Sequence, residues 1–123
     1  MPLKIQVKQT NPTTIALNGR LDTSTAPELD KVLDRVLVNP RIPRLVFDAS
    51  GLDYLSSAGI RCFIRARKAL EPSGGSVAIV NPQPGVRKVL DIVKAIPAGG
   101  IFASVEELDA YLDDMQRQVR DGE

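Results

Sequence analysis

The chain has 123 residues, of which 43% are hydrophobic and 25% are charged, and this size and balance fit one compact domain. Its 16 basic and 15 acidic residues give a net charge of +1, so it lacks the strong positive field that non-specific nucleic-acid binding uses, and we expect no direct contact with nucleic acid. With one cysteine and no histidine, the chain cannot form an internal disulfide, a multi-cysteine metal cage or a histidine-dependent catalytic triad. We therefore expect no metal site and no cofactor.

The apolar stretches of the sequence are about as long as strands. They are far shorter than the roughly 20 residues that a membrane-spanning helix needs. The N-terminus also lacks a charged start followed by an apolar signal core. We expect a cytoplasmic protein that does not insert into a membrane.

The first part of the chain has the pattern of a β-hairpin. Leu3, Ile5 and Val7 alternate with polar residues, which is the period of a strand with one face in water. Asn11 and Pro12 break this pattern and suit a short connection. A second strand is predicted over residues 13–17, after which the segment 19–22 is expected to leave the sheet.

A first amphipathic helix is predicted to begin near Thr25, which forms a possible capping box with Glu28, and to end before Pro40. Residues 45–47 are apolar and bounded by turn residues, as in a short buried strand. The pattern then predicts a helix over residues 58–70, a strand over residues 76–80 and a third helix from Pro84.

The C-terminal part is predicted to hold a minimal edge strand at Ile101 and Phe102 and a final helix. That helix has a capping box of Ser104 and Glu107 and an apolar stripe that continues to Val119. The whole order predicts one α/β domain over residues 1–119, with a mixed β-sheet, an N-terminal antiparallel hairpin, four α-helices and a frayed tail over residues 120–123.

Small polar residues stand at the junction between the buried strand and the second helix. Ser56 or Ser57 is expected to cap this helix by accepting hydrogen bonds from its first N–H groups, while Ala58 and Gly59 leave room for an approaching partner. Such a junction is a natural binding site, although a serine that only caps the helix remains an alternative. Cys62, on the same helix, is interpreted as a small core residue.

A set of segments follows in a fixed order along the chain: Gly19-Arg20-Leu21-Asp22, Leu45-Val46-Phe47-Asp48, Tyr54-Leu55-Ser56-Ser57-Ala58-Gly59-Ile60-Arg61, Gly74-Gly75 and the helix from Pro84 to Val93. Together they resemble the STAS domain of bacterial anti-sigma factor antagonists, and the resemblance covers nearly the whole chain. It implies a single STAS-type domain that binds partners and is not an enzyme.

The resemblance also implies a phosphorylation site. Members of the family carry the acceptor serine in a segment similar to Asp-Ser-Ser-Gly, and alignment on Gly59 places this acceptor at Ser57. Ser56 then stands where the family has aspartate, and Ala58 where it has the second serine. Ser56 therefore stays open as an alternative acceptor.

The partners follow from the same resemblance. The unphosphorylated protein is expected to bind an anti-sigma factor with serine-kinase activity, to free the sigma factor, and to be inactivated when that kinase phosphorylates it. A serine phosphatase of the PP2C type would reverse the modification. The residues expected at the partner surface are Asp22, Thr23, Ser56, Ser57, Ala58, Gly59 and Arg61.

Elementary electrostatics favours a phosphate at this junction. The N-terminus of a helix has unpaired N–H donors and a partial positive charge, both of which stabilise an anion. Arg61 lies one helical turn beyond Ser57, and Arg65 and Lys68 continue the same stripe, which either contacts a partner or is a solvated face. We therefore expect that the fold survives phosphorylation and that the modification acts on the partner surface.

Other interpretations remain open at this stage. Asp22 has Thr23 beside it and a further two hydroxyl residues after it, so its role is either partner contact or the capping of the first helix. The protein is alternatively an accessory STAS subunit of a lipid-transport ABC system or of a signalling complex, in which the serine is never modified. Catalysis by Ser57 with a lysine base is disfavoured, because no lysine is near it in sequence and the Gly-x-Ser-x-Gly motif of hydrolases is missing.

Overall fold

A computed structural model describes residues 3–39, 41–95 and 105–122 of the chain. The elements follow in the order β1 (Lys4–Gln9), β2 (Thr13–Leu21), α1 (Ala26–Val36), β3 (Arg44–Leu55), α2 (Ser57–Leu70), the 3₁₀ turn η1 (Glu71–Ser73), β4 (Ser76–Val80), α3 (Pro84–Ala95) and α4 (Val105–Gly122). The predicted edge strand at Ile101 and Phe102 and the cap at Ser104 lie outside the described residues.

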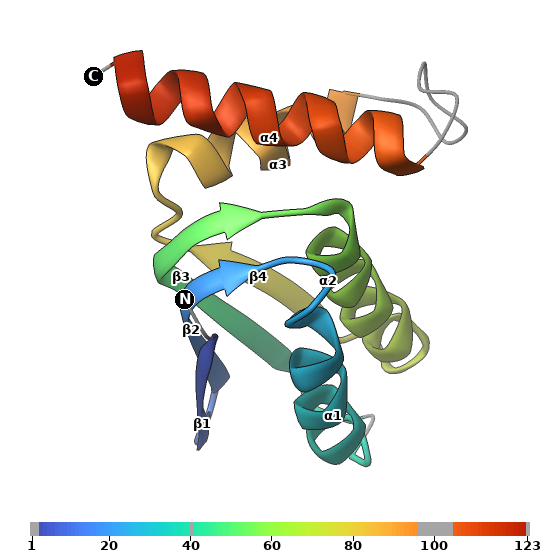
Figure 1. The fold of residues 1–123 in the computed structure, drawn as a ribbon. Coiled ribbons are helices and arrows are strands. Elements are labelled where there is room, and N and C mark those ends of the chain that lie inside the picture. The colour runs from blue at the N-terminus through green and yellow to red at the C-terminus, as the bar shows by residue number, and fades with distance from the viewer. Residues whose placement is uncertain (1–2, 40, 96–104, 123) are drawn as a thin grey trace.

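The strands form one mixed sheet in the order β1-β2-β3-β4. β1 and β2 are antiparallel, whereas β2 with β3 and β3 with β4 are parallel. In Figure 1, α1 and α2 lie side by side against the sheet, and α4 crosses above the last part of β3. The predicted α/β class, with its N-terminal hairpin, mixed sheet and four α-helices, is confirmed.

Two strands are longer than the sequence predicts. β2 continues to Leu21, so most of the segment 19–22, which is expected to leave the sheet, belongs to it, and β3 continues from the predicted residues 45–47 to Leu55. Their pairing contains register shifts that local periodicity does not reveal. Gly51 lies at one such shift, where an added Cβ would be 1.7 Å from Asn18 Oδ1 and 3.1 Å from the Leu17 carbonyl oxygen, so a larger residue would require the Asn18 side chain to move.

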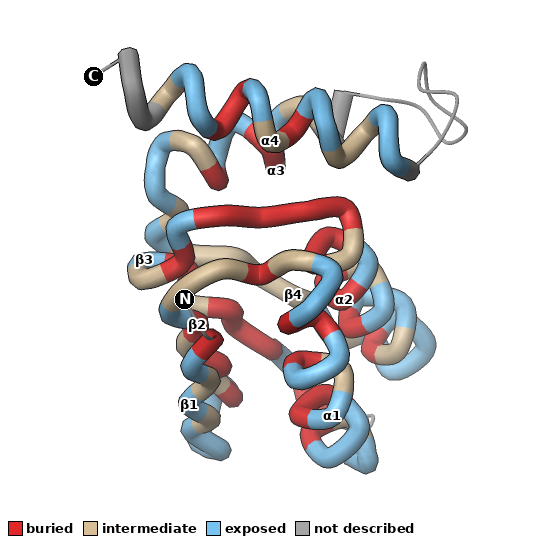
Figure 2. Tube along the Cα trace, in the orientation of Figure 1, coloured by how far each residue is buried: buried red, intermediate tan, exposed pale blue. Residues whose placement is uncertain are grey.

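The last part of β3 is mostly buried, and Asp53 is the exposed residue among its final four. Leu52, Tyr54 and Leu55 are all buried, and Figure 2 shows this part of the chain as a buried stretch beneath α4. Asp48 interrupts the apolar run after Phe47, and the exposed Ser50 and Asp53 interrupt it again. The prediction therefore stopped at Phe47, where the continuous apolar run ends.

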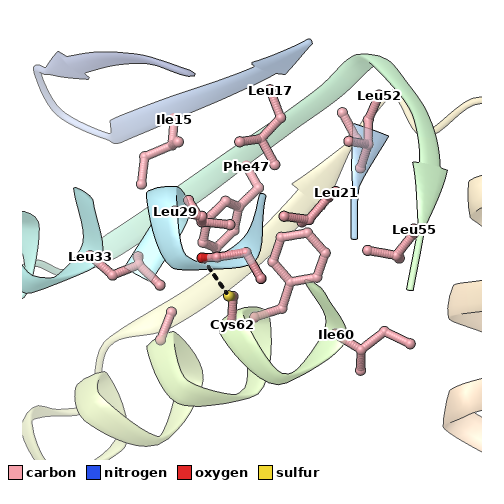
Figure 3. Close-up of a cluster of buried hydrophobic side chains, with 14 of the residues drawn as sticks. Ile15, Leu17, Leu21, Leu29, Leu33, Phe47, Leu52, Leu55, Ile60 and Cys62 are labelled. Atoms are coloured by element: carbon pink, nitrogen blue, oxygen red, sulfur yellow. Dashed lines mark hydrogen bonds between the residues drawn. The ribbon is translucent and has the colours of Figure 1, made fainter. Parts of the chain in front are cut away.

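The core lies between the sheet and the helices α1 and α2. Figure 3 shows leucines of β2, β3 and α1 meeting side chains of α2, and the rings of Phe47 and Phe63 are 4.7 Å apart at their centroids. Cys62 belongs to this core, as predicted: it is 2% exposed, and its thiol donates to the carbonyl oxygen of Ala26 at 3.8 Å. Burial, together with the nearby Asp30, raises the pKa of the Cys62 thiol to about 12.

Candidate functional site

The C-terminal ends of β2 and β3 bring the two predicted loops together. Leu21 pairs with Leu55 as the last step of the parallel ladder. One residue further on, the Ser56 N–H donates to the carbonyl oxygen of Leu21 at 2.9 Å. The turn that begins at Asp22 therefore lies directly beside the start of α2.

The Asp22 side chain organises the turn before α1. Its Oδ1 accepts hydrogen bonds from the Ser24 N–H at 3.0 Å, the Ser24 hydroxyl at 2.8 Å and the Thr25 N–H at 3.1 Å. Partial burial by itself would raise the pKa of Asp22, but the hydrogen bonds from Ser24 and Thr25 outweigh it and hold the pKa below its ordinary value. The Asp22 side chain thus orders the turn that precedes α1, but it bonds to no N–H group of the helix itself.

The predicted capping box at the start of α1 does not form. Thr25 has no side-chain cap bond to α1. Instead, its hydroxyl donates to the carbonyl oxygen of Arg20 at 2.8 Å and accepts from the Asp22 N–H at 2.9 Å. Thr25 therefore ties the turn back to β2, and Asp22 replaces it as the acceptor for the N–H groups before α1.

The serines at the start of α2 are both buried. Ser56 is 3% exposed and occupies the N-cap position, yet it makes no side-chain cap bond. Ser57, the first helical residue, is 7% exposed. Within the described residues, neither serine Oγ has a hydrogen-bond partner. The prediction that one of these hydroxyls caps the helix is therefore wrong.

A carboxylate from the far end of the chain supplies the missing cap. Asp109, in the first part of α4, accepts a hydrogen bond from the Ser57 N–H through Oδ1 at 2.9 Å. A carboxylate in this position satisfies an unpaired donor and complements the partial positive charge of the helix N-terminus. Asp109 thus occupies the anion position that the sequence suggested for a phosphate.

Gly59 allows close packing of α2 against the sheet and does not leave space for a partner. A Cβ at this position would be 2.6 Å from Leu21 Cγ and 2.7 Å from Leu55 Cδ1. Since real Cβ contacts are longer than this, glycine is what lets α2 approach the last pair of β2 and β3. The expectation that Gly59 leaves room for a partner is wrong for this residue, whereas Ala58 is half-buried and lines the adjoining groove.

That groove, of about 840 Å³, runs between α1 and α2. Among its lining residues are Thr23, Ala58 and Arg61, which the sequence assigned to the partner surface, and also Glu106 and Asp109 of α4. Arg61 is exposed on the wall of the groove. Arg65 forms ion pairs with Asp30 and Asp34 of α1, so this member of the basic stripe holds the two helices together.

Gln116 is the site residue that the sequence analysis missed. It lies on α4, is 5% exposed, and binds both backbone groups of Leu55: its Oε1 accepts from the Leu55 N–H and its Nε2 donates to the Leu55 carbonyl oxygen, each at 2.9 Å. The available signal was a glutamine beside Met115 on the apolar stripe of the last helix. Nothing in that local pattern reveals its partner, which is 61 positions away.

In residues 3–39, 41–95 and 105–122, no group of three or more aspartate, glutamate or cysteine side chains is arranged to hold a metal ion. None of the described helices is long and apolar enough to span a membrane. The site consists of the N-terminus of α2 with its buried serine hydroxyls and a groove lined by basic and acidic residues. α4 contacts the N-terminus of α2 through Asp109.

Comparison with known proteins identifies relatives of the chain. The model of the STAS domain family matches residues 4–108. The chain is similar to the putative anti-sigma factor antagonist BtrV of Bordetella bronchiseptica, with 33% identity over 76 residues that cover 62% of this chain and 65% of that protein. It is also similar to the anti-sigma F factor antagonist of Paenibacillus polymyxa, with 24% identity over 78 residues, 63% of this chain and 67% of that protein.

Solved structures share the fold. An anti-sigma factor antagonist from Mycobacterium paratuberculosis superposes with a TM-score of 0.67 at 22% identity, over 96% of this chain and 94% of that chain. The anti-sigma factor antagonist SpoIIAA in its unphosphorylated form gives a TM-score of 0.59 at 19% identity, over 72% of this chain and 83% of that chain. At such identities the likeness concerns the fold alone.

Proposed function

Because this chain belongs to the STAS domain family, we propose that it is an anti-sigma factor antagonist, a regulatory protein that docks on an anti-sigma factor and performs no catalysis itself. The names of its relatives from Bordetella and Paenibacillus support this role. The observation that carries the proposal is the hydrogen bond from the Ser56 N–H to the Leu21 carbonyl oxygen. It joins the Asp22 turn and the first turn of α2 into one continuous edge beside the groove that Arg61 lines.

Ser57 is the proposed phosphoacceptor of this edge. Its Oγ would bond to the γ-phosphorus of ATP as the bond to the leaving ADP breaks, and the hydroxyl proton would pass to a base of the kinase. The product carries about −1.5 to −2 charges at neutral pH. A charge of this size at a docking edge repels acidic groups of a partner and removes a hydrogen-bond donor. Phosphorylation by an anti-sigma factor with serine-kinase activity would thus release the partner, and a PP2C-type phosphatase would restore binding.

The proposal is tested by incubating the protein with a candidate anti-sigma factor kinase and ATP and locating the phosphate by mass spectrometry. We expect modification of the wild type and of Ser56→Ala, and none of Ser57→Ala. Ser56→Ala is the matched control, because it removes the neighbouring hydroxyl, which is also buried and also has no hydrogen-bond partner among the described residues. Phosphate that persists in Ser57→Ala would refute the assignment of the acceptor.

A second function is favoured by one observation, the burial of the Ser57 hydroxyl. An accessory STAS subunit of a lipid-transport ABC system or signalling complex needs no exposed serine, because its serine is never modified. In that role, Ser57→Ala would leave complex formation intact. Co-purification of the chain with transporter subunits, unchanged by Ser57→Ala, would support this function over the phosphorylation switch.

A further inference from the structure

α4 contacts the rest of the domain through one face of the helix. Asp109 and Gln116 are seven positions apart, which is close to two helical turns, so their side chains point to the same side. Leu112 between them is 0% exposed and the adjacent Met115 is 6% exposed. The face of α4 that meets the domain therefore combines an apolar centre with a polar group at each end.

The polar group at one end, the Gln116 amide, binds the backbone of β3 as a neighbouring strand would. β3 pairs with β4 only as far as Asp48 and Val80, so within residues 3–39, 41–95 and 105–122 no strand pairs with Leu55 on that side. The Gln116 amide fills this place, because it presents an acceptor to the Leu55 N–H and a donor to the Leu55 carbonyl oxygen. These are the two hydrogen bonds that a neighbouring strand would make to Leu55. Water or a strand of a partner protein can therefore take the place of the Gln116 amide.

The polar group at the other end, Asp109, binds the backbone of the proposed acceptor. The Asp109 carboxylate binds the Ser57 N–H at 2.9 Å, and the Ser57 Oγ is enclosed without any hydrogen-bond partner in the described part of the chain. A hydroxyl that is enclosed in this way cannot reach the γ-phosphate of ATP. A phosphate on Ser57 and the Asp109 carboxylate would also compete for the same N–H donor.

We propose that α4 is a built-in cover of the Ser57 site, which has to leave the Leu55 backbone and the Ser57 N–H before a partner or a kinase engages this edge. α4 and the partner are then competitors for one surface, and the docked helix keeps the protein in a closed state. The biological meaning of the cover rests on the proposed function, because that function names the competitor. The cover itself is a property of this chain and is measured without any partner.

The test uses the full chain carrying Ser57→Cys and the neutral reagent iodoacetamide, with peptide mass spectrometry to separate the two thiols. Cys62 is the natural reference, since its buried thiol, with a pKa of about 12, is modified only when the core opens. The rate at residue 57 is compared with and without Gln116→Ala. The matched control is Gln118→Ala, the same chemical change on the exposed side of α4.

We expect slow alkylation at residue 57 in the Ser57→Cys chain. Gln116→Ala should accelerate it by about tenfold, which corresponds to a loss of about 1.4 kcal/mol from the docking of α4. Gln118→Ala should change the rate by less than about twofold, and the rate at Cys62 should stay constant throughout. Asp109→Ala serves as a second variant that loosens the other end of the cover.

Two outcomes would overturn the proposal. Equal rates at residue 57 in all variants would mean that α4 does not control access. A parallel rise at residue 57 and at Cys62 would mean that Gln116 supports the whole fold rather than a separate cover. If α4 passes this test while no candidate kinase phosphorylates Ser57, the cover stands and the phosphorylation switch fails, so the two results are distinguishable.

Discussion

A negative charge at Ser57 should act first on α4, and the size of this effect follows from the geometry. In Ser57→Asp, the new carboxylate shares the N-terminus of α2 with Asp109, whose Oδ1 is 2.9 Å from the Ser57 nitrogen. Two unit charges about 5 Å apart repel by about 3 kcal/mol at an effective dielectric constant of about 20. The helix N-terminus stabilises the added anion by about 0.5–1 kcal/mol. Solvent screening of the half-exposed Asp109 also lowers the repulsion between the two carboxylates. We expect a net loss of about 1–2 kcal/mol in the free energy of unfolding.

A double-mutant cycle measures this repulsion. Urea unfolding of the wild type, Ser57→Asp, Asp109→Asn and the double variant gives the coupling energy between the two positions. We expect Asp109→Asn to remove most of the cost of Ser57→Asp, with a coupling energy of about 1–2 kcal/mol. Ser57→Asn is the control of matched size, and Asp109→Asn should not rescue it. Losses that add within about 0.5 kcal/mol would refute the reasoning.

This prediction revises what the sequence suggests. From the helix N-terminus alone, a phosphate at Ser57 is expected to leave the fold untouched, because unpaired N–H groups await an anion there. In the structure, Asp109 already occupies that place. We therefore expect a second anion at this place to weaken the contact between Asp109 and α2 as well as to alter the partner surface.

Two further predictions concern packing and pH. Gly59→Ala should lower the free energy of unfolding by about 1–2 kcal/mol, because the added methyl group overlaps Leu21 and Leu55 and this overpacking exceeds the gain in helix propensity. Gly85→Ala in α3 is the control: its Cβ would be 3.8 Å from the nearest side chain, so urea unfolding should show an unchanged or slightly increased stability, and an equal loss in both variants would contradict the packing argument. The lowered pKa of Asp22 should stabilise the fold above the ordinary carboxyl pKa of 3.8, and this contribution should disappear as the pH falls through the lower pKa of the folded state. Asp22→Asn should therefore flatten the stability profile below about pH 5, and a slope identical to that of the wild type would show that Asp22 does not cause it.

The sequence by itself determined the elements whose signal is local. The alternation of Leu3, Ile5 and Val7 predicted the first strand, and apolar stripes predicted the helices, because each pattern repeats within one element. The resemblance to the STAS domain, confirmed by the match over residues 4–108, also came from the order of short segments. Ser57 was placed correctly at the start of a helix, since strand, turn residue and helix are neighbours in sequence.

Only the tertiary structure decided what surrounds Ser57. The cap on its N–H comes from Asp109, 52 positions later, and the partner of the Leu55 backbone is Gln116, 61 positions later. Local periodicity places both residues on the last helix but does not say where that helix docks. Docking depends on the backbone of β3 beyond its pairing with β4, which Gln116 binds at Leu55. The same contacts convert an apparently open helix N-terminus into a buried one, and they decide that a phosphate at Ser57 meets a carboxylate rather than an empty site.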